Sequence, residues 1–287
     1  MSDAPLLTVR NLRVIYPGDE GDVAAVRNVS FTLGRERLGI VGESGSGKST
    51  TGRAIMGLVP EPGRITADEM RLGDIDLLRL NERGFRRLRG KRIAMVLQDP
   101  KYSLDPVMTV GHQIAETHRC HFRSNAKTAR AAALEMLEAV HIRDPERVYA
   151  LYPHQVSGGM GQRVMIAMML IAGPDLLIAD EPTSALDVSV QQQVLAIMDD
   201  LVRRRGMGLI LISHNLHLVS SFCDRVLVMY AGLVVETCNA GELAQARHPY
   251  TQGLLASLPE LGRRRGELPQ LQRDPAWADE DLVEQST

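Results

Sequence analysis

The chain has 287 residues, enough for one large α/β domain with an insertion or for about two average domains. Its 33 Lys and Arg residues nearly balance its 35 Asp and Glu residues, so no overall positive field favours nucleic acid. No apolar run approaches the roughly 20 residues that cross a bilayer, and the start MSDAPLLTVR lacks the charged and apolar regions of a secretory signal. We therefore expect a cytosolic chain.

The N-terminal part predicts an antiparallel sheet at the edge of the fold. Residues 6–15 alternate between apolar and polar, and residues 26–33 form a second candidate strand, with the turn-rich PGDEGD between them. Tyr16 ends the first run. An aromatic at a strand end either packs against the core or stacks on a nucleotide base, and the local sequence leaves both roles open.

Residues 38–50, LGIVGESGSGKST, indicate a strand, a glycine-rich loop and the start of a helix. Such a loop turns its N–H groups toward a polyphosphate, which also faces the positive end of the helix dipole. Lys48 is then expected to contact the β- and γ-phosphates, and the Ser49 hydroxyl can ligate Mg²⁺. Alone, the loop indicates a nucleoside triphosphate, so kinases, GTPases, helicases and transport ATPases all remain open. The predicted nucleotide-binding residues of this loop are Gly42, Glu43, Ser44, Gly45, Ser46, Gly47, Lys48, Ser49 and Thr50.

The middle of the chain predicts a helical insertion between two buried strands. Residues 71–92 are polar and basic without interleaved aromatics, which is typical of a solvated helix face rather than of a nucleic-acid site. Residues 93–97 predict a buried strand. It ends at Gln98, and a polar residue there points toward the ligand crevice of a parallel sheet. Residues 100–151 then have a helical pattern, strongest at 127–140.

A second candidate anion site is the sequence Ser157-Gly158-Gly159, ahead of an apolar helix expected from about residue 162 to 172. The serine either caps the helix or, with the exposed N–H groups, binds an anion. The methionines of this helix predict core packing.

Two further apolar strands end in polar residues. Residues 176–179 lead into Asp180 and Glu181, and adjacent carboxylates at a buried strand end are costly without a cation or proton. Asp180 is suited to hold Mg²⁺ through water, and Glu181 to orient or deprotonate the attacking water. Residues 209–212 lead into His214, whose neutral imidazole can hydrogen-bond a γ-phosphate.

The C-terminal third predicts one amphipathic helix and a closing hairpin. Residues 184–187 turn into the helix, and residues 225–229 and 233–236 form the hairpin. After Pro249 the pattern becomes irregular, and the last dozen residues are expected to be disordered. The three cysteines have neither metal spacing nor a disulfide framework and are expected to be buried or incidental thiols.

In this order, the motifs resemble those of ATP-binding-cassette proteins across nearly the whole chain. The segments QDPKYSLDPVMTVG, LYPHQVSGGMGQRVMIAMML, ADEPTSALDVSVQ and HPYTQGLLASLPE look like those of ATPases from oligopeptide, dipeptide and nickel importers. The resemblance implies an α/β phosphate-loop fold, with a mostly parallel core sheet, an antiparallel edge subdomain and an inserted helical subdomain. It implies the Walker A loop at 42–50, the Q-loop at Gln98, the signature at 156–160, Walker B at Asp180, the catalytic Glu181, the D-loop at 184–187 and the switch His214.

The resemblance also implies a role for each of these residues in ATP binding and hydrolysis. Tyr16 matches the position that stacks on adenine. Lys48, Gln98, Glu181 and His214 serve hydrolysis of ATP, and Ser49, Gln98 and Asp180 hold Mg²⁺. Ser157, Gly158 and Gly159 act on the ATP of a partner subunit.

Such importers pair two ATPase subunits, usually different chains, with two membrane permeases and an extracytoplasmic solute-binding protein. The implied location is the cytoplasmic face of the plasma membrane, and no nucleic acid is expected. The expected division is a first core part at 1–99, a helical subdomain at 100–172, a second core part at 173–246 and a C-terminal extension at 247–287.

Some features depart from the family pattern. Gly161 stands where Arg is common, and Asn215 replaces an Asp that often follows the switch histidine. The cysteine-rich iron–sulfur tail of some relatives is missing, so no cluster is expected. Non-transport ABC ATPases that act on DNA or ribosomes are a rival class, but they generally carry coiled-coil inserts, zinc modules or two cassettes, none of which this sequence indicates.

Overall fold

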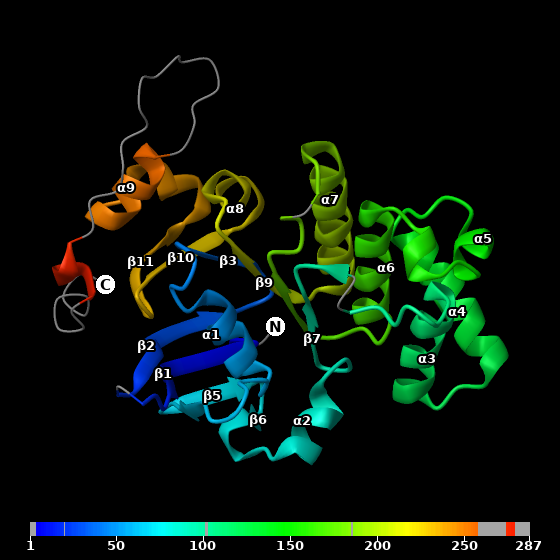
Figure 1. Cartoon of the computed structure of the whole chain (residues 1–287), viewed down its shortest axis with the longest axis horizontal. Helices are drawn as coiled ribbons and strands as arrows, with labels where there is room; N and C mark the ends of the chain where they lie inside the picture. The colour runs from blue at the N-terminus through cyan, green and yellow to red at the C-terminus, as the bar shows by residue number, and fades with distance from the viewer. Residues whose placement is uncertain (1–3, 20, 101–102, 185, 258–273, 279–287) are drawn as a thin grey trace. The chain divides into compact units, whose positions relative to one another are not determined.

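The computed structural model describes residues 4–19, 21–100, 103–184, 186–257 and 274–278 (Figure 1). The chain divides into two compact units: unit 1 contains residues 1–82 and 210–287, and unit 2 contains residues 83–209. The stretch expected to be disordered lies outside the described residues except at 276–278, which belong to a 3₁₀ helix, η5 (Pro275–Ala278). Among the described helices, none is both long and apolar enough to cross a membrane.

The first layer of unit 1 is the predicted antiparallel sheet. Strands β1 and β2 pair along most of their length, as expected from their alternating patterns, and their inward residues Leu7, Leu12 and Leu33 are fully buried. The spatial order is β2-β1-β5-β6, with β4 also on β1. These strands are β1 (Leu7–Tyr16), β2 (Val23–Leu33), β4 (Arg64–Thr66), β5 (Glu69–Leu72) and β6 (Ile75–Asp76).

The expectation of a helix face throughout residues 71–92 is wrong for its first part. Gly73, with φ of 54°, turns β5 back into β6, and a short 3₁₀ helix, η1 (Leu77–Arg79), follows. Only α2 (Glu82–Leu88) is α-helical. Its arginines at 83, 86 and 87 are exposed while Phe85 is buried, so the solvated face is confirmed over that helix alone.

The second layer of unit 1 contains the strand that leads into the phosphate loop. β3 pairs in parallel with β10, which forms the predicted hairpin with β11. The strand β9 crosses the boundary between the units and lies beside β3. These strands are β3 (Arg37–Val41), β9 (Gly208–Ser213), β10 (Arg225–Tyr230) and β11 (Leu233–Asn239).

Helices cover these strands, and the sequence patterns missed two of them. Helix α1 (Lys48–Ile55) was expected, whereas α8 (Leu216–Phe222) was not. The irregular tail predicted after Pro249 is wrong over α9 (Pro249–Ala256), which follows the 3₁₀ helix η4 (Ala240–Gln245). Proline at the first helical position is favourable, and the His248 Nδ1 accepts the Tyr250 N–H at 3.2 Å, so this helix starts without a Ser, Thr, Asp or Asn cap.

Unit 2 contains the helical insertion that the sequence predicts between two parallel strands. β7 pairs in parallel with β8, and fully buried side chains such as Ile114, Leu137, Met165 and Ile178 form its core. The signature helix α6 begins at Gly158, about four residues earlier than expected, because Ser157 caps it. The strands are β7 (Ile93–Val96) and β8 (Leu176–Asp180), and the helices are α3 (Val110–Phe122), α4 (Ala126–Ala139), α5 (Pro145–Tyr149), η3 (Pro153–Gln155), α6 (Gly158–Leu170) and α7 (Val188–Arg205).

The cap of α4 gives a test of local stability. The Asn125 Oδ1 accepts the Thr128 N–H at 2.9 Å, so Asn125→Ala should lower the free energy of unfolding by about 1 kcal/mol. Urea denaturation followed by circular dichroism measures this change. Asn125→Asp retains an acceptor and is the control; equal losses in the two variants would contradict the capping role.

Candidate functional site

The phosphate loop takes a backbone path that only glycine permits at two points. Gly42 has φ of 149°, and a Cβ there would lie 2.1 Å from the Met229 carbonyl oxygen. Gly47 has φ of 95°, and its Cβ would lie 2.4 Å from the Ala25 carbonyl oxygen. Because both close approaches are to backbone, a side chain could not be accommodated by a rotamer change.

Backbone and side-chain hydrogen bonds hold the loop on both sides. The Ser46 carbonyl accepts the Gly232 N–H at 3.1 Å, and the Gly232 carbonyl accepts the Arg27 N–H at 2.8 Å. The Glu43 N–H donates to the Tyr250 hydroxyl at 3.0 Å. Neither the contact with Gly232 nor the contact with Tyr250 was predicted from the sequence. The HPYT segment indicates only a family resemblance, and nothing in the hairpin sequence points to the loop.

Lys48 carries the loop's positive charge at a buried position. The residue is 6% exposed, and its Nζ donates to the carbonyls of Gly42 and Glu43 at 2.9 and 2.6 Å and to the Ser46 Oγ at 3.3 Å. These three acceptors are neutral oxygens. An anionic phosphate would therefore be a stronger partner for the ammonium than the carbonyls that hold it here.

The start of α1 completes an anion-binding geometry. The N-cap residue of the helix is Gly47, which makes no side-chain cap hydrogen bond, so a phosphate can take the capping role. Ser44 and Gly45 are exposed at the tip of the loop, whereas Ser49 and Thr50 are half-buried in the first turn. The predicted residues 42–50 thus lie together as one loop and helix start.

Unit 1 also contains the two outlying nucleotide-site candidates. Tyr16 is half-buried at the end of β1, and Gly63 leaves room for its ring, since a Cβ there would lie 2.6 Å from the Tyr16 Cε1. His214 is exposed between β9 and α8. Asn215, the departure from the family pattern, caps α8 by accepting the Leu218 N–H at 3.1 Å. The substitution therefore keeps the capping function that an Asp would serve.

Unit 2 contains the strand-end carboxylates. Asp180 ends β8 with 7% of its surface exposed, and the following Glu181 has φ of 47°, in the left-handed region. The Ser184 N–H and hydroxyl both donate to the Glu181 carbonyl, at 3.3 and 3.2 Å. The D-loop serine thus fixes the turn that presents Glu181. Gln98 is exposed just after β7, and Ala185 of the D-loop lies outside the described residues.

The signature segment lines a depression of about 400 Å³ together with the start of α7. Ser157 is exposed and caps α6, its Oγ accepting the Met160 N–H at 3.4 Å. Asp187 caps α7, and its carboxylate accepts the Val190 N–H. This hydrogen bond is the main reason that the pKa of the Asp187 carboxyl group is lowered, and a second hydrogen bond from the Ser189 hydroxyl adds to the effect. Gly159 of α6 lies close to Val190 of α7, since a Cβ at Gly159 would be only 2.5 Å from the Val190 Cγ1. The absence of a side chain therefore allows the two helices to approach each other here.

Gly161 is buried in α6 beside Pro100. A Cβ at this glycine would make ordinary contacts of 3.5 Å with the Pro100 Cγ. The departure from the family's Arg therefore removes a long side chain from a position that has room for a methyl group. The peptide backbone of the helix is continuous through it.

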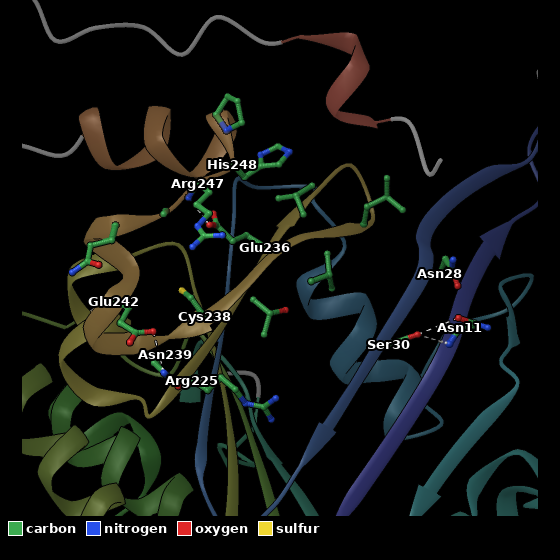
Figure 2. A pocket seen from close by; sticks show the side chains of 17 residues that line it. Asn11, Asn28, Ser30, Arg225, Glu236, Cys238, Asn239, Glu242, Arg247 and His248 are labelled. Carbon is green, nitrogen blue, oxygen red and sulfur yellow. Dashed lines mark hydrogen bonds between the residues drawn. The ribbon is translucent and has the colours of Figure 1, made fainter. Parts of the chain in front are cut away.

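A cleft of about 1060 Å³ in unit 1 is not at the phosphate loop. Figure 2 shows Asn11, Asn28 and Ser30 on one side of it and residues of β11 on the other. Cys238 lines this cleft, and burial followed by the nearby carboxylates of Glu236 and Glu242 raises the pKa of its thiol to about 11. Burial raises the pKa of the Cys223 thiol to about 12, and Cys120 is exposed. None of the residues that line this cleft belongs to the predicted nucleotide-binding loop, so the size of a cavity does not locate the chemistry here.

Comparison with known proteins decides the family. A family model described as "ABC transporter" matches residues 26–184, more than half of the chain. The chain belongs to the ABC transporter family. Its α/β cassette fold and its assignment as an ATP-binding, ATP-hydrolysing subunit, both expected from the sequence, are confirmed.

Individual relatives agree with this assignment. The dipeptide transport ATP-binding protein DppD of Haemophilus influenzae is 46% identical over 269 residues, which cover 93% of this chain and 82% of DppD. The oligopeptide transport ATP-binding protein OppD of Bacillus subtilis is 48% identical, covering 89% of this chain and 72% of OppD. A dimeric structure of the ATP-binding cassette MJ0796 bound to ADP and Pi has a TM-score of 0.73 and 26% identity, and covers 82% of this chain and 98% of that one.

The contact at Gly159 gives a prediction about this ABC cassette. Gly159→Ala should lower the melting temperature, because the new methyl group would overlap the Val190 side chain. Gly158→Ala is the matched control: a Cβ there meets nothing within 4 Å, so this variant should be at least as stable as the wild type. Differential scanning fluorimetry compares the two. Equal melting temperatures would contradict the packing argument.

Proposed function

We propose that this chain is one of two ATPase subunits that power the uptake of small peptides through separate membrane subunits. The observation that carries the proposal is the combination of a phosphate loop with Lys48 in unit 1 and strand-end carboxylates with a signature segment in unit 2. Relatives with this cassette across most of their length are named for dipeptide and oligopeptide transport. Peptides or closely related solutes are therefore the proposed cargo.

In this proposal the phosphate loop binds the polyphosphate of ATP. Lys48 exchanges its carbonyl partners for the β- and γ-phosphates, and the N–H groups at the start of α1 contact the same anion. Tyr16 stacks on the adenine ring, and His214 hydrogen-bonds the γ-phosphate. All of these proposed contacts with ATP come from unit 1.

Mg²⁺ fits the oxygen donors that the chain provides. The hydroxyl of Ser49, the amide oxygen of Gln98 and the carboxylate of Asp180 are the hard ligands that this ion prefers, and Asp180 is a nearly buried carboxylate, which a cation would stabilise. When bound, the ion neutralises the charge that develops on the phosphates. Glu181 orients or deprotonates the attacking water, and the turn fixed by Ser184 holds it in place.

The signature segment is proposed to act on the partner's ATP. Ser157 and Gly158 are exposed at the start of α6, so their hydroxyl and N–H groups are accessible to an external phosphate. The cassette MJ0796 is described as dimeric in a post-hydrolysis state with ADP and Pi, which supports a pairing of two cassettes. A head-to-tail pair then has two ATP sites, each completed by the other subunit.

The remaining partners are two membrane permeases and, through them, an extracytoplasmic solute-binding protein, with this chain on the cytoplasmic face of the plasma membrane. Gln98 and residues 102–105 are the proposed link to a permease; Tyr102 lies outside the described residues. Val107, close by, is 78% exposed and offers apolar surface for such a contact.

Two substitutions separate binding from hydrolysis in the reconstituted transporter. Lys48→Ala should abolish tight ATP binding at this loop, because the phosphates lose their charged partner. Glu181→Gln should retain binding but slow hydrolysis at this site by at least about 10²-fold, because the water loses its base. Filter binding of labelled ATP, phosphate release and uptake of a labelled dipeptide measure the three steps.

Three results of this experiment would each contradict a different part of the proposal. Wild-type hydrolysis by Glu181→Gln would show that the catalytic assignment is wrong. ATP hydrolysis without uptake of any small peptide, in a complex that holds both permeases and the binding protein, would contradict the cargo class. Copurification with nucleic acid and without membrane proteins would instead favour the non-transport class.

A further inference from the structure

A buried tyrosine from the C-terminal part of the chain contacts the phosphate loop. Tyr250, in α9, is fully buried, and its hydroxyl accepts the Glu43 N–H at 3.0 Å across 207 positions of sequence. A buried tyrosine usually places its hydroxyl on a polar partner, and here that partner is a loop amide. A residue outside the nucleotide-binding motifs therefore fixes one peptide of the loop.

The same loop residue also holds the loop's lysine. The Glu43 carbonyl accepts the Lys48 Nζ at 2.6 Å, while its N–H donates to Tyr250. Both hydrogen-bonding groups of the Glu43 backbone are thus engaged. Movement of this residue would change the position of the ammonium group that the phosphates meet.

An aromatic cluster holds Tyr250 itself. Its ring centroid lies 4.6 Å from that of Tyr230 and 6.0 Å from that of Trp277, and the Trp277 ring also lies near Tyr230 and His248, at 5.9 and 6.1 Å. The His248 Nδ1 accepts the Tyr250 N–H. Burial lowers the pKa of this imidazole, although Glu236 opposes the shift, which favours the neutral ring that can accept. Helix α9 and η5, both visible in Figure 1, contribute to this cluster.

We propose that Tyr250 is a positioning residue for the phosphate loop, so that packing of α9 and Trp277 and binding of ATP at the loop favour each other. Such a coupling is reciprocal: if the packed cluster raises ATP affinity, bound ATP stabilises the packed cluster by the same free energy. The inference rests on the proposed binding of ATP at this loop. It gives the segment after β11 a role in nucleotide affinity.

The test compares two hydroxyl deletions in the full chain. Tyr250→Phe removes the hydroxyl to which the Glu43 N–H donates and leaves that half-buried amide without this acceptor, so ATP should bind about tenfold more weakly. The turnover rate at saturating ATP should change less than twofold, because no group that touches the reacting atoms is altered. Tyr230→Phe is the matched control, since it removes a hydroxyl from the same cluster and leaves the Tyr250 hydroxyl that accepts the Glu43 N–H.

Trp277 supplies a direct readout, as the chain's only tryptophan. In the wild type and in Tyr230→Phe, ATP should shift its fluorescence emission; in Tyr250→Phe the shift at saturating ATP should be reduced. If Tyr250 only stabilised the fold, Tyr250→Phe would lower the melting temperature but would not weaken ATP binding while leaving the turnover rate nearly unchanged. ATP affinity and a Trp277 response equal to the wild type in Tyr250→Phe would overturn the proposal, and so would equal losses in both variants.

Hydrogen exchange on the wild-type chain keeps the inference testable if Tyr250→Phe does not fold. The Glu43 amide should exchange much more slowly than the amides of Ser44 and Gly45 at the exposed tip of the loop; equal exchange at the three would overturn the proposal. Failure of the proposed ATP site is distinguished by the wild type, which would then bind no ATP whether or not Glu43 is protected.

Discussion

The structure of this ABC cassette depends on a close backbone approach in the phosphate loop. Hydrogen atoms of Gly42 and Gly47 occupy space next to the carbonyls of Met229 and Ala25, where a methyl group would overlap oxygen. This approach lets the loop turn tightly enough for Lys48 to lie inside it. Strand β10 and the start of β2 therefore shape the phosphate loop, which is the proposed ATP site, through their backbones rather than their side chains.

The chain's two units contribute different chemistry. Unit 1 provides the anion-binding loop, Tyr16 and His214, whereas unit 2 provides Gln98, the carboxylates after β8 and the signature helix. Strand β9 is the segment through which the chain returns from unit 2 to unit 1, and His214 follows it directly. A residue proposed to sense the γ-phosphate thus lies at a connection between the units along the chain.

Much of this arrangement could be predicted from the sequence, because long apolar runs and glycine spacing are local signals. Buried strands such as β8 and long helices such as α4 were predicted within a few residues. Strands β4, β5 and β6 were missed because they have only two to four residues and, unlike the equally short β7, contain no unbroken apolar run. Helix α8 was also missed, because its seven residues are too few to show a helical period.

The rest could not be predicted because it depends on contacts distant in sequence. Tyr250 follows a proline and lies 207 positions from Glu43, so its local pattern indicates only an irregular tail. Helix α6 starts earlier than predicted because Ser157 caps it. From the sequence alone, a serine before two glycines fits a helix cap and an anion ligand equally well. The resemblance identified the signature segment, and the structure then showed how Val190 requires a glycine beside it.

The central claim is that this chain supplies the phosphate loop of one ATP site and the signature of the other. The most direct measurement is photolabelling of the assembled complex with a photoreactive ATP analogue, followed by separation of the two ATPase subunits. Lys48→Ala in this chain should abolish labelling of this chain and spare its partner. Ser157→Arg should instead reduce nucleotide trapping on the partner. Equal loss of label from both subunits with either substitution would contradict the account.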